Sequence, residues 1–115
     1  MAFQRVRGMR DWFPEDKAIQ LQVFDTLRKT ALSFGFQEVE SPAIESIELL
    51  TAKSGSEIKE QIFVLEKKGA EEMALRFDLT VPLTRMFIEK QKEQPKPIKW
   101  FCLSRMWRYE APQKG

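Results

Sequence analysis

The sequence predicts an α+β fold in which helices flank an antiparallel sheet, and three observations support this prediction. Apolar residues recur at helical spacing over residues 15–33, which indicates a long helix. Two strand-like runs, 62–65 and 73–78, are joined through residues 67–69, a Lys-Lys-Gly segment typical of a hairpin. The run 98–110 is apolar on both faces, as expected for a strand in the middle of a sheet that is covered on both sides.

The composition is that of an ordinary globular chain. Of the 115 residues, 43% are apolar and 31% are charged, which excludes a mainly disordered chain, and the length allows at most one domain. The formal net charge of +2 is too small to indicate nucleic-acid binding by itself. No signal-peptide core and no apolar run of about 18 residues occurs. We therefore expect a soluble, cytoplasmic protein without a membrane partner.

The residue types exclude several kinds of site within this chain. The sequence has no histidine and one cysteine, Cys102, which lies in an apolar, strand-like run. An internal disulfide is therefore impossible, a zinc site has too few ligands, and no Ser-His or Cys-His catalytic pair can form. We expect Cys102 to fill space in the structure and no residue of the chain to ligate a metal.

The first part of the chain is expected to form an arm, a helix and a short strand. Residues 5–14 suit an extended arm that leads into the helix over 15–33, because Pro14 loses no hydrogen bond in a first helical turn. Gly35 is placed to end this helix. Residues 36–42 indicate a short strand that stops at its proline, which cannot donate to a sheet ladder. The apolar helix residues expected to pack in the core or in a dimer are Ile19, Leu21, Val23, Phe24, Leu27, Ala31 and Phe34.

The second part is expected to contain two further helices. Residues 44–53 suit a short helix, followed by a loop at 54–56. After the hairpin, residues 80–91 suit a helix with Pro82 in its first turn, and residues 93–97 form a proline-punctuated connector to the last strand. The residues expected on the apolar side of this helix are Leu83, Phe87 and Ile88.

The end of the last strand is expected to present charged residues on one surface. Side chains alternate faces along a strand, so Arg108 and Glu110 point the same way. That surface offers a planar cation suited to phosphate or carboxylate and, beside it, an acceptor for an amine. Residues 112–115 are typical of a turn, so a return strand that completes a hairpin is expected after them. The sheet is therefore expected to be incomplete in this chain.

Three segments occur in a fixed order along the chain. A helix leads through a glycine to a strand ending at Pro42, a strand end carries residues 76–80 into a helix, and a central strand ends in residues 107–110. Together these segments resemble the class II aminoacyl-tRNA synthetases. Residues 17–42 are similar to motif 1 of that class, and residues 98–115 to the first strand and loop of motif 2.

Shorter segments narrow this resemblance. Residues 7–11 (Arg-Gly-Met-Arg-Asp), 75–82 (Leu-Arg-Phe-Asp-Leu-Thr-Val-Pro) and 112–115 (Pro-Gln-Lys-Gly) resemble the histidyl-tRNA synthetase family. Bacterial members usually carry Pro-Glu-Gly-Thr where this chain has Phe-Asp-Leu-Thr at 77–80, so the archaeal and eukaryotic form is the more similar one. The resemblance spans essentially the whole chain. It implies that residues 1–115 are the N-terminal portion of a class II catalytic domain, with no second domain here.

The resemblance implies a reaction and roles for particular residues. The reaction is ATP-dependent activation of histidine to histidyl-adenylate, followed by transfer to tRNA(His), and Mg2+ is implied by the family's ATP chemistry. Arg108 is implied as the catalytic residue that bridges the α-phosphate and the histidine carboxylate, two negative groups that must be brought together and screened. Glu110 is implied to accept from the adenine amino group. Asp78 and Thr80 are implied to hold the α-amino group of histidine.

Simpler roles stay open for the same residues. Taken alone, Arg108 suits a surface ion pair, and Asp78 or Thr80 suits a helix N-cap. Gln113 and Lys114 belong either to a solvated turn or to a loop that contacts ATP or the acceptor end of tRNA.

Three whole-protein functions fit these observations. The first is the synthetase, a homodimer through the motif 1 region. In the family, a return strand, a histidine-specific loop and the motif 3 arginine follow, so the 115-residue piece alone is expected to be inactive. The second is a synthetase-like, non-catalytic regulatory subunit of histidine biosynthesis, and the third is a free-standing protein-interaction domain. We expect the synthetase, because the residues implied to bind substrates are retained.

Overall fold

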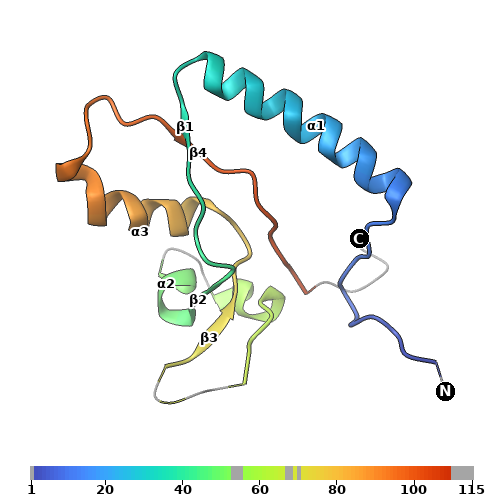
Figure 1. The fold of residues 1–115 in the computed structure, drawn as a ribbon. Coiled ribbons are helices and arrows are strands. Elements are labelled where there is room, and N and C mark those ends of the chain that lie inside the picture. The colour runs from blue at the N-terminus through green and yellow to red at the C-terminus, as the bar shows by residue number, and fades with distance from the viewer. Residues whose placement is uncertain (1, 53–55, 67–68, 70, 110–115) are drawn as a thin grey trace.

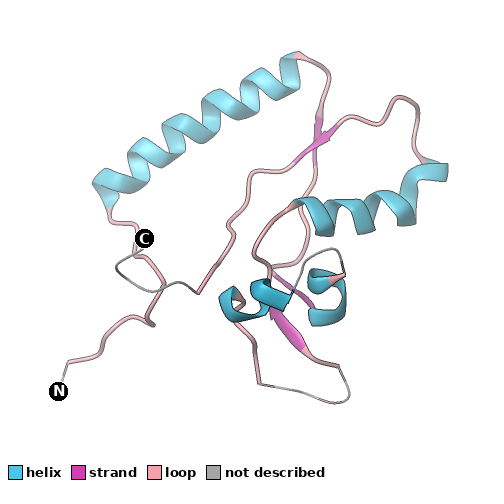
Figure 2. Cartoon of the chain, turned by 180° about the vertical axis from the view of Figure 1, so that it is seen from behind, coloured by secondary structure: helices cyan, strands magenta, loops and turns pink. Residues whose placement is uncertain are grey.

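A computed structural model describes residues 2–52, 56–66, 69 and 71–109 (Figure 1). In both views, helix α1 runs along one margin, whereas α2, α3, β2 and β3 form a separate group, with the β1–β4 pair between the two (Figures 1 and 2). The elements in chain order are α1 (Pro14–Ser33), β1 (Gln37–Glu38), β2 (Ile44–Ser46), α2 (Ile47–Thr51), η1 (Ser56–Gln61), β3 (Met73–Leu75), α3 (Thr80–Lys90), η2 (Gln91–Glu93) and β4 (Trp100–Phe101).

Helix α1 confirms the predicted helix almost residue for residue. Pro14 occupies the first turn, and Glu15 and Asp16 place negative charge at the positive end of the helix dipole. The helix ends at Ser33, and Gly35 follows with a φ of +83°, a conformation that favours glycine. No residue of α1 is buried. The large apolar side chains that it exposes are Ile19, Leu21, Val23, Leu27 and Leu32.

An ion pair joins α1 to β1. Arg28 donates from Nε and Nη2 to the two carboxylate oxygens of Glu38 at 2.8 and 3.2 Å. These hydrogen bonds lower the pKa of the Glu38 carboxyl and raise the pKa of Arg28, because they favour the charged form of each partner. The pair helps to fix the direction in which the chain leaves α1.

Two small sheets confirm the α+β class. Strand β2 pairs antiparallel with β3, with Ala74 opposite Glu45. Strand β1 pairs parallel with β4, with Gln37 opposite Trp100. The parallel pair was not predicted, because it joins segments about 60 residues apart that carry no local signal for each other. The predicted strand over 36–42 is therefore correct only at 37–38.

The predicted hairpin is confirmed in its pairing. The Leu65 amide donates to Met73 O and the Leu75 amide to Phe63 O, both at 3.0 Å, and Val64 forms an antiparallel bridge with Ala74. Strand β3 therefore lies between β2 and the 63–65 segment. Residues 67 and 68 of the predicted turn lie outside the described residues.

The prediction of a helix over 44–53 was wrong at its start. Residues 44–46 form strand β2, because the β3 edge is available to pair with them, and the helix α2 begins only at Ile47. Ser46 caps α2: its Oγ accepts from the Leu49 amide at 3.1 Å. Of the loop predicted at 54–56, Ser56 already belongs to η1, and residues 54 and 55 lie outside the described residues.

The long central strand predicted over 98–110 was also wrong in extent. Only Trp100 and Phe101 form a strand, because only they have a ladder partner among the described residues. The chain beyond them is fixed by isolated bonds: the Trp107 amide donates to Arg76 O at 3.0 Å and the Tyr109 amide to Gln61 O at 2.8 Å. Burial on both faces, which the prediction assumed, is not seen: the side chains over 98–109 are half-buried or exposed.

Helix α3 confirms the predicted helix over 80–91, with Pro82 buried in its first turn. Its apolar side is only partly covered, since Phe87 and Ile88 are exposed. Among the described residues, the buried apolar core is small and lies between β3, α2 and η1; it consists of Leu50, Ile62, Ala74 and Phe77.

The described fold is open for its length. Its radius of gyration is 16.8 Å, against about 13 Å expected for a globular domain of about 115 residues. The difference follows from α1, which lies away from the core (Figure 2). Much apolar surface of the described residues is therefore left uncovered.

Candidate functional site

Asp78 and Thr80 lie where the chain passes from β3 into α3. Asp78 is half-buried, and its Oδ1 accepts from the Val81 amide at 3.4 Å, a long and weak bond. Thr80 is the first residue of α3, and its side chain is exposed. If Asp78 caps α3, only one of its two carboxylate oxygens takes part, and its hydrogen bond is weak. The carboxylate keeps acceptor capacity for a cationic group.

Arg108 lies beside this turn. Its guanidinium carbon is 5.9 Å from the centre of the Phe77 ring, and Phe77 directly precedes Asp78. The arginine side chain is exposed, while the backbone on either side is held by the bonds of Trp107 and Tyr109. The fold thus places Arg108 beside Phe77, the residue that precedes Asp78, although Asp78 and Arg108 are 30 positions apart in the sequence.

Not every residue expected at the site can be placed. Glu110, Gln113 and Lys114 lie outside the described residues, so their expected roles stay predictions. The segment that leads toward them is held against the hairpin, because the Tyr109 ring meets the Phe63 ring edge-on, with centroids 5.3 Å apart.

Arg76 is a feature that the sequence did not reveal. Its side chain is 4% exposed, and its guanidinium donates to backbone carbonyl groups of two distant segments. Nε donates to Arg105 O at 2.7 Å, and Nη1 to Ser41 O at 2.7 Å and Pro42 O at 3.2 Å. The available signal was an arginine at the end of a strand, two positions before Asp78, which alone suits a surface ion pair equally well.

The N-terminal arm is folded against the hairpin rather than fully extended. The Met9 amide donates to Val6 O at 3.1 Å, closing a turn in which Gly8 has a φ of +89°. A Cβ at Gly8 would lie 2.9 Å from Phe63 Cζ, so the close approach also requires glycine. Phe63 also meets Tyr109, so this ring contacts both the arm and the residue that follows Arg108.

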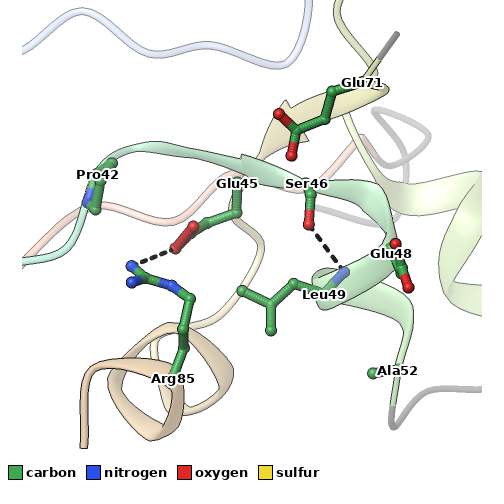
Figure 3. A pocket seen from close by; sticks show the side chains of 8 residues that line it. All are labelled: Pro42, Glu45, Ser46, Glu48, Leu49, Ala52, Glu71 and Arg85. Carbon is green, nitrogen blue, oxygen red and sulfur yellow. Dashed lines mark hydrogen bonds and ion pairs between the residues drawn. The ribbon is translucent and has the colours of Figure 1, made fainter. Parts of the chain in front are cut away.

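A hollow of about 600 Å³ lies on the side of β2 that faces α3 (Figure 3). Glu45 and Arg85 point toward each other across it, with Arg85 Nη2 donating to Glu45 Oε2 at 3.0 Å. Its lining includes neither Asp78 nor Arg108. A more apolar hollow of about 330 Å³ includes Thr80 and Arg85. The Glu45–Arg85 ion pair thus lies between β2 and α3, in a hollow that Asp78 and Arg108 do not line.

Over the part of the chain that the structure describes, no group of three or more His, Cys, Asp or Glu side chains is arranged to hold a metal ion. We therefore name no residue of this chain as a Mg2+ ligand and assign no catalytic step to a metal. Within the same residues, no helix is both long and apolar enough to cross a membrane.

Three kinds of comparison relate this chain to known proteins. Among curated sequences, the histidine–tRNA ligase of Haloarcula marismortui is 42% identical over 113 residues, which are 98% of this chain and 26% of that protein. The chain therefore spans about a quarter of the length of the curated relatives it matches.

Solved structures also match this chain over only part of their own length. The histidyl-tRNA synthetase of Nostoc sp. PCC 7120 matches with a TM-score of 0.81 and 31% identity, over 95% of this chain and 26% of that one. A Bacillus halodurans structure, titled an ATP phosphoribosyltransferase regulatory subunit/histidyl-tRNA synthetase, matches with a TM-score of 0.83 and 25% identity, over 94% of this chain and 28% of that one. The family model described as histidyl-tRNA synthetase matches residues 8–115. The chain belongs to the histidyl-tRNA synthetase family.

Proposed function

We propose that this chain is the N-terminal portion of the catalytic domain of a cytoplasmic histidine–tRNA ligase. The ligase activates histidine with ATP and transfers it to tRNA(His). Support comes from the family match over 8–115 and from the identity to archaeal relatives that are named as ligases. The observation that carries the proposal is the position of Arg108 next to Phe77, the residue that directly precedes Asp78.

In the proposed reaction, a carboxylate oxygen of histidine attacks the α-phosphate of ATP. The bond from that phosphorus to the bridging oxygen breaks, and pyrophosphate leaves. Arg108 donates N–H groups to both the carboxylate and the α-phosphate, since its planar fork can serve two acceptors at once. This screens two negative groups as they approach. No enzyme nucleophile is required, which agrees with a chain that has no histidine.

Asp78 and Thr80 hold the α-amino group of histidine in this proposal. The weak bond from the Val81 amide leaves the Asp78 carboxylate able to accept from an ammonium group. Glu110, two residues beyond Arg108, accepts from the adenine amino group, and Gln113 and Lys114 belong to a loop that contacts ATP or tRNA. Mg2+ accompanies ATP as its counter-ion.

We also propose that the protein is a homodimer through residues 17–42. Support comes from α1, which contains no buried residue and exposes five large apolar side chains along its length. An apolar surface of this kind is typical of an interface with another chain. A second copy of the chain packed on α1 would also bury the apolar surface that α1 leaves exposed in this open fold.

Arg108→Lys in the full-length protein tests the catalytic role. Histidine-dependent pyrophosphate exchange should fall by about 100-fold or more in kcat, because an ammonium group cannot bridge two acceptors. Arg105→Lys is the matched control: it makes the same change on an exposed side chain of the same segment and should retain wild-type exchange. Near-normal exchange in Arg108→Lys would refute the role.

Asp78 is tested by two substitutions. Asp78→Ala should raise the KM for histidine by about 30- to 1000-fold and the KM for ATP much less, because a charged partner of a bound ammonium is lost. Asp78→Asn separates this role from helix capping, since Asn caps helices as well as Asp does but carries no charge. A wild-type KM for histidine in Asp78→Asn would reduce Asp78 to a cap.

The regulatory-subunit alternative is not favoured. The curated relatives with about 40% identity are named ligases, whereas the structure whose title carries both names is 25% identical. A folded full-length protein without any histidine-dependent exchange would bring that alternative back.

A further inference from the structure

The Arg76 guanidinium sits where three segments of the chain meet. Besides the bonds to Arg105 O, Ser41 O and Pro42 O, its Nη1 lies 3.2 Å from Ser41 Oγ. Arg76 is only 4% exposed to solvent, and among the described residues no carboxylate lies within ion-pair distance of it. A buried cation held by carbonyl groups and one hydroxyl group is an arrangement that fixes geometry, because each hydrogen bond has a preferred direction.

The backbone of Arg76 adds to this arrangement. Its amide donates to Ala43 O at 2.9 Å, and its carbonyl accepts from the Trp107 amide at 3.0 Å. Its guanidinium carbon also lies 5.8 Å from the centre of the Trp107 ring. Arg76 therefore contacts Arg105 and Trp107, two residues of the segment that leads directly into Arg108.

We infer that Arg76 is a positioning residue for the proposed reaction: it holds the segment that carries Arg108 at a fixed place relative to Asp78. The inference rests on the proposed function. Asp78 lies two positions after Arg76 on the same strand end, and Arg108 lies three positions after Arg105. The Arg76 side chain thus links the strand end that carries Asp78, the proposed partner of the amino group, to the segment that carries Arg108, the proposed bridge between carboxylate and phosphate.

A guanidinium is needed at this position because its donors point to separate places. Nε is directed to Arg105 O, while Nη1 is directed to the end of the 41–42 segment. A lysine ammonium would keep the charge but could not serve both places from one nitrogen. The backbone bonds to Ala43 and Trp107 would survive the change. We therefore expect Arg76→Lys to fold with its Arg108 segment loosened.

The test is histidine-dependent pyrophosphate exchange by the full-length Arg76→Lys protein. We expect kcat to fall by about tenfold, because a misplacement near 1 Å can cost as much as about 100-fold, while the KM for histidine and ATP changes by less than about threefold. Ser41→Ala is a milder second variant, which removes one bond to Nη1 and should lower kcat by about two- to threefold. Arg85→Lys is the control for the substitution itself and should keep wild-type kcat, because its ion pair with Glu45 survives.

A double variant separates positioning from general stability. If Arg76 acts through Arg108, the loss in Arg76→Lys/Arg108→Lys is smaller than the product of the two single losses. A folded Arg76→Lys protein with lowered thermal stability and wild-type kcat, together with wild-type kcat in Ser41→Ala, would overturn the inference. If Arg108→Lys itself has normal exchange, the proposed function fails instead.

Discussion

Replacing Glu45 by Gln tests the ion pair that joins β2 to α3. The Glu45 side chain is 9% exposed, whereas 34% of the Arg85 side chain is exposed. Removing one partner of a fully buried pair costs about 3–5 kcal/mol. Because water reaches Arg85, and because Gln retains an oxygen that accepts from Nη2, we expect a cost of about 1.5 kcal/mol here. Arg85 Nε, which is buried and has no hydrogen-bond partner among the described residues, adds to the sensitivity of this position.

Hydrogen exchange in the full-length protein, followed by mass spectrometry, measures this cost locally. About 1.4 kcal/mol corresponds to a tenfold change in an opening equilibrium, so amides of α3 and of the β2–β3 pair should exchange about tenfold faster in Glu45→Gln. Glu93→Gln is the control, since the Lys90–Glu93 pair is exposed and 3.6 Å long, and it should change exchange by less than about twofold. Wild-type exchange of α3 in Glu45→Gln would show that this ion pair does not hold α3 to β2.

Two further predictions concern the N-terminal part. Gly8→Ala should open the turn that packs on Phe63, because both the positive φ and the 2.9 Å approach disfavour a Cβ; a strain of about 1–2 kcal/mol predicts roughly tenfold faster tryptic cleavage in the arm, and unchanged cleavage would contradict it. By NMR, the pKa of Glu38 should lie below the usual value of about 4.3 and return toward it in Arg28→Gln. Since this pKa is lowered by folding, the contribution of the pair is present above the unfolded pKa and is lost as pH falls through the folded one; a Glu38 pKa unaffected by Arg28→Gln would contradict the assignment.

The parts of the fold that depend on local sequence were predictable. Helix α1 follows from the spacing of its apolar residues and from Pro14, helix α3 from Pro82 and its own spacing, and the pairing of 63–65 with β3 from two strand-like runs near a glycine. Each signal lies within about 20 residues of the feature it determines. The same holds for the motif segments, which identified the family before any geometry was known.

The parts that depend on distant partners were not predictable. The parallel β1–β4 pair joins residues 37–38 to 100–101, and neither segment shows which partner it will meet. Residues 44–46 were expected to be helical. They form a strand instead, because in that conformation their backbone groups hydrogen-bond to the edge of β3. The run 98–110 was expected to be a regular central strand, because its apolar pattern reports burial but not the neighbours that provide it.

The candidate site shows the same difference between residues that the sequence could indicate and residues whose partners are distant in the sequence. Asp78 is half-buried and Arg108 is exposed, so both side chains are accessible to a ligand, and their proposed roles were implied by the resemblance to the family. Arg76 is buried and donates to backbone carbonyl groups and to Ser41 Oγ, and its neighbours in the sequence do not distinguish it from a surface arginine. A sequence can therefore indicate which groups act on a substrate, whereas the groups that set the distance between them become visible only when the chain is folded. For this reason the Arg76 variants, rather than further substitutions of Arg108, test whether the fold contributes geometry to the reaction as well as functional groups.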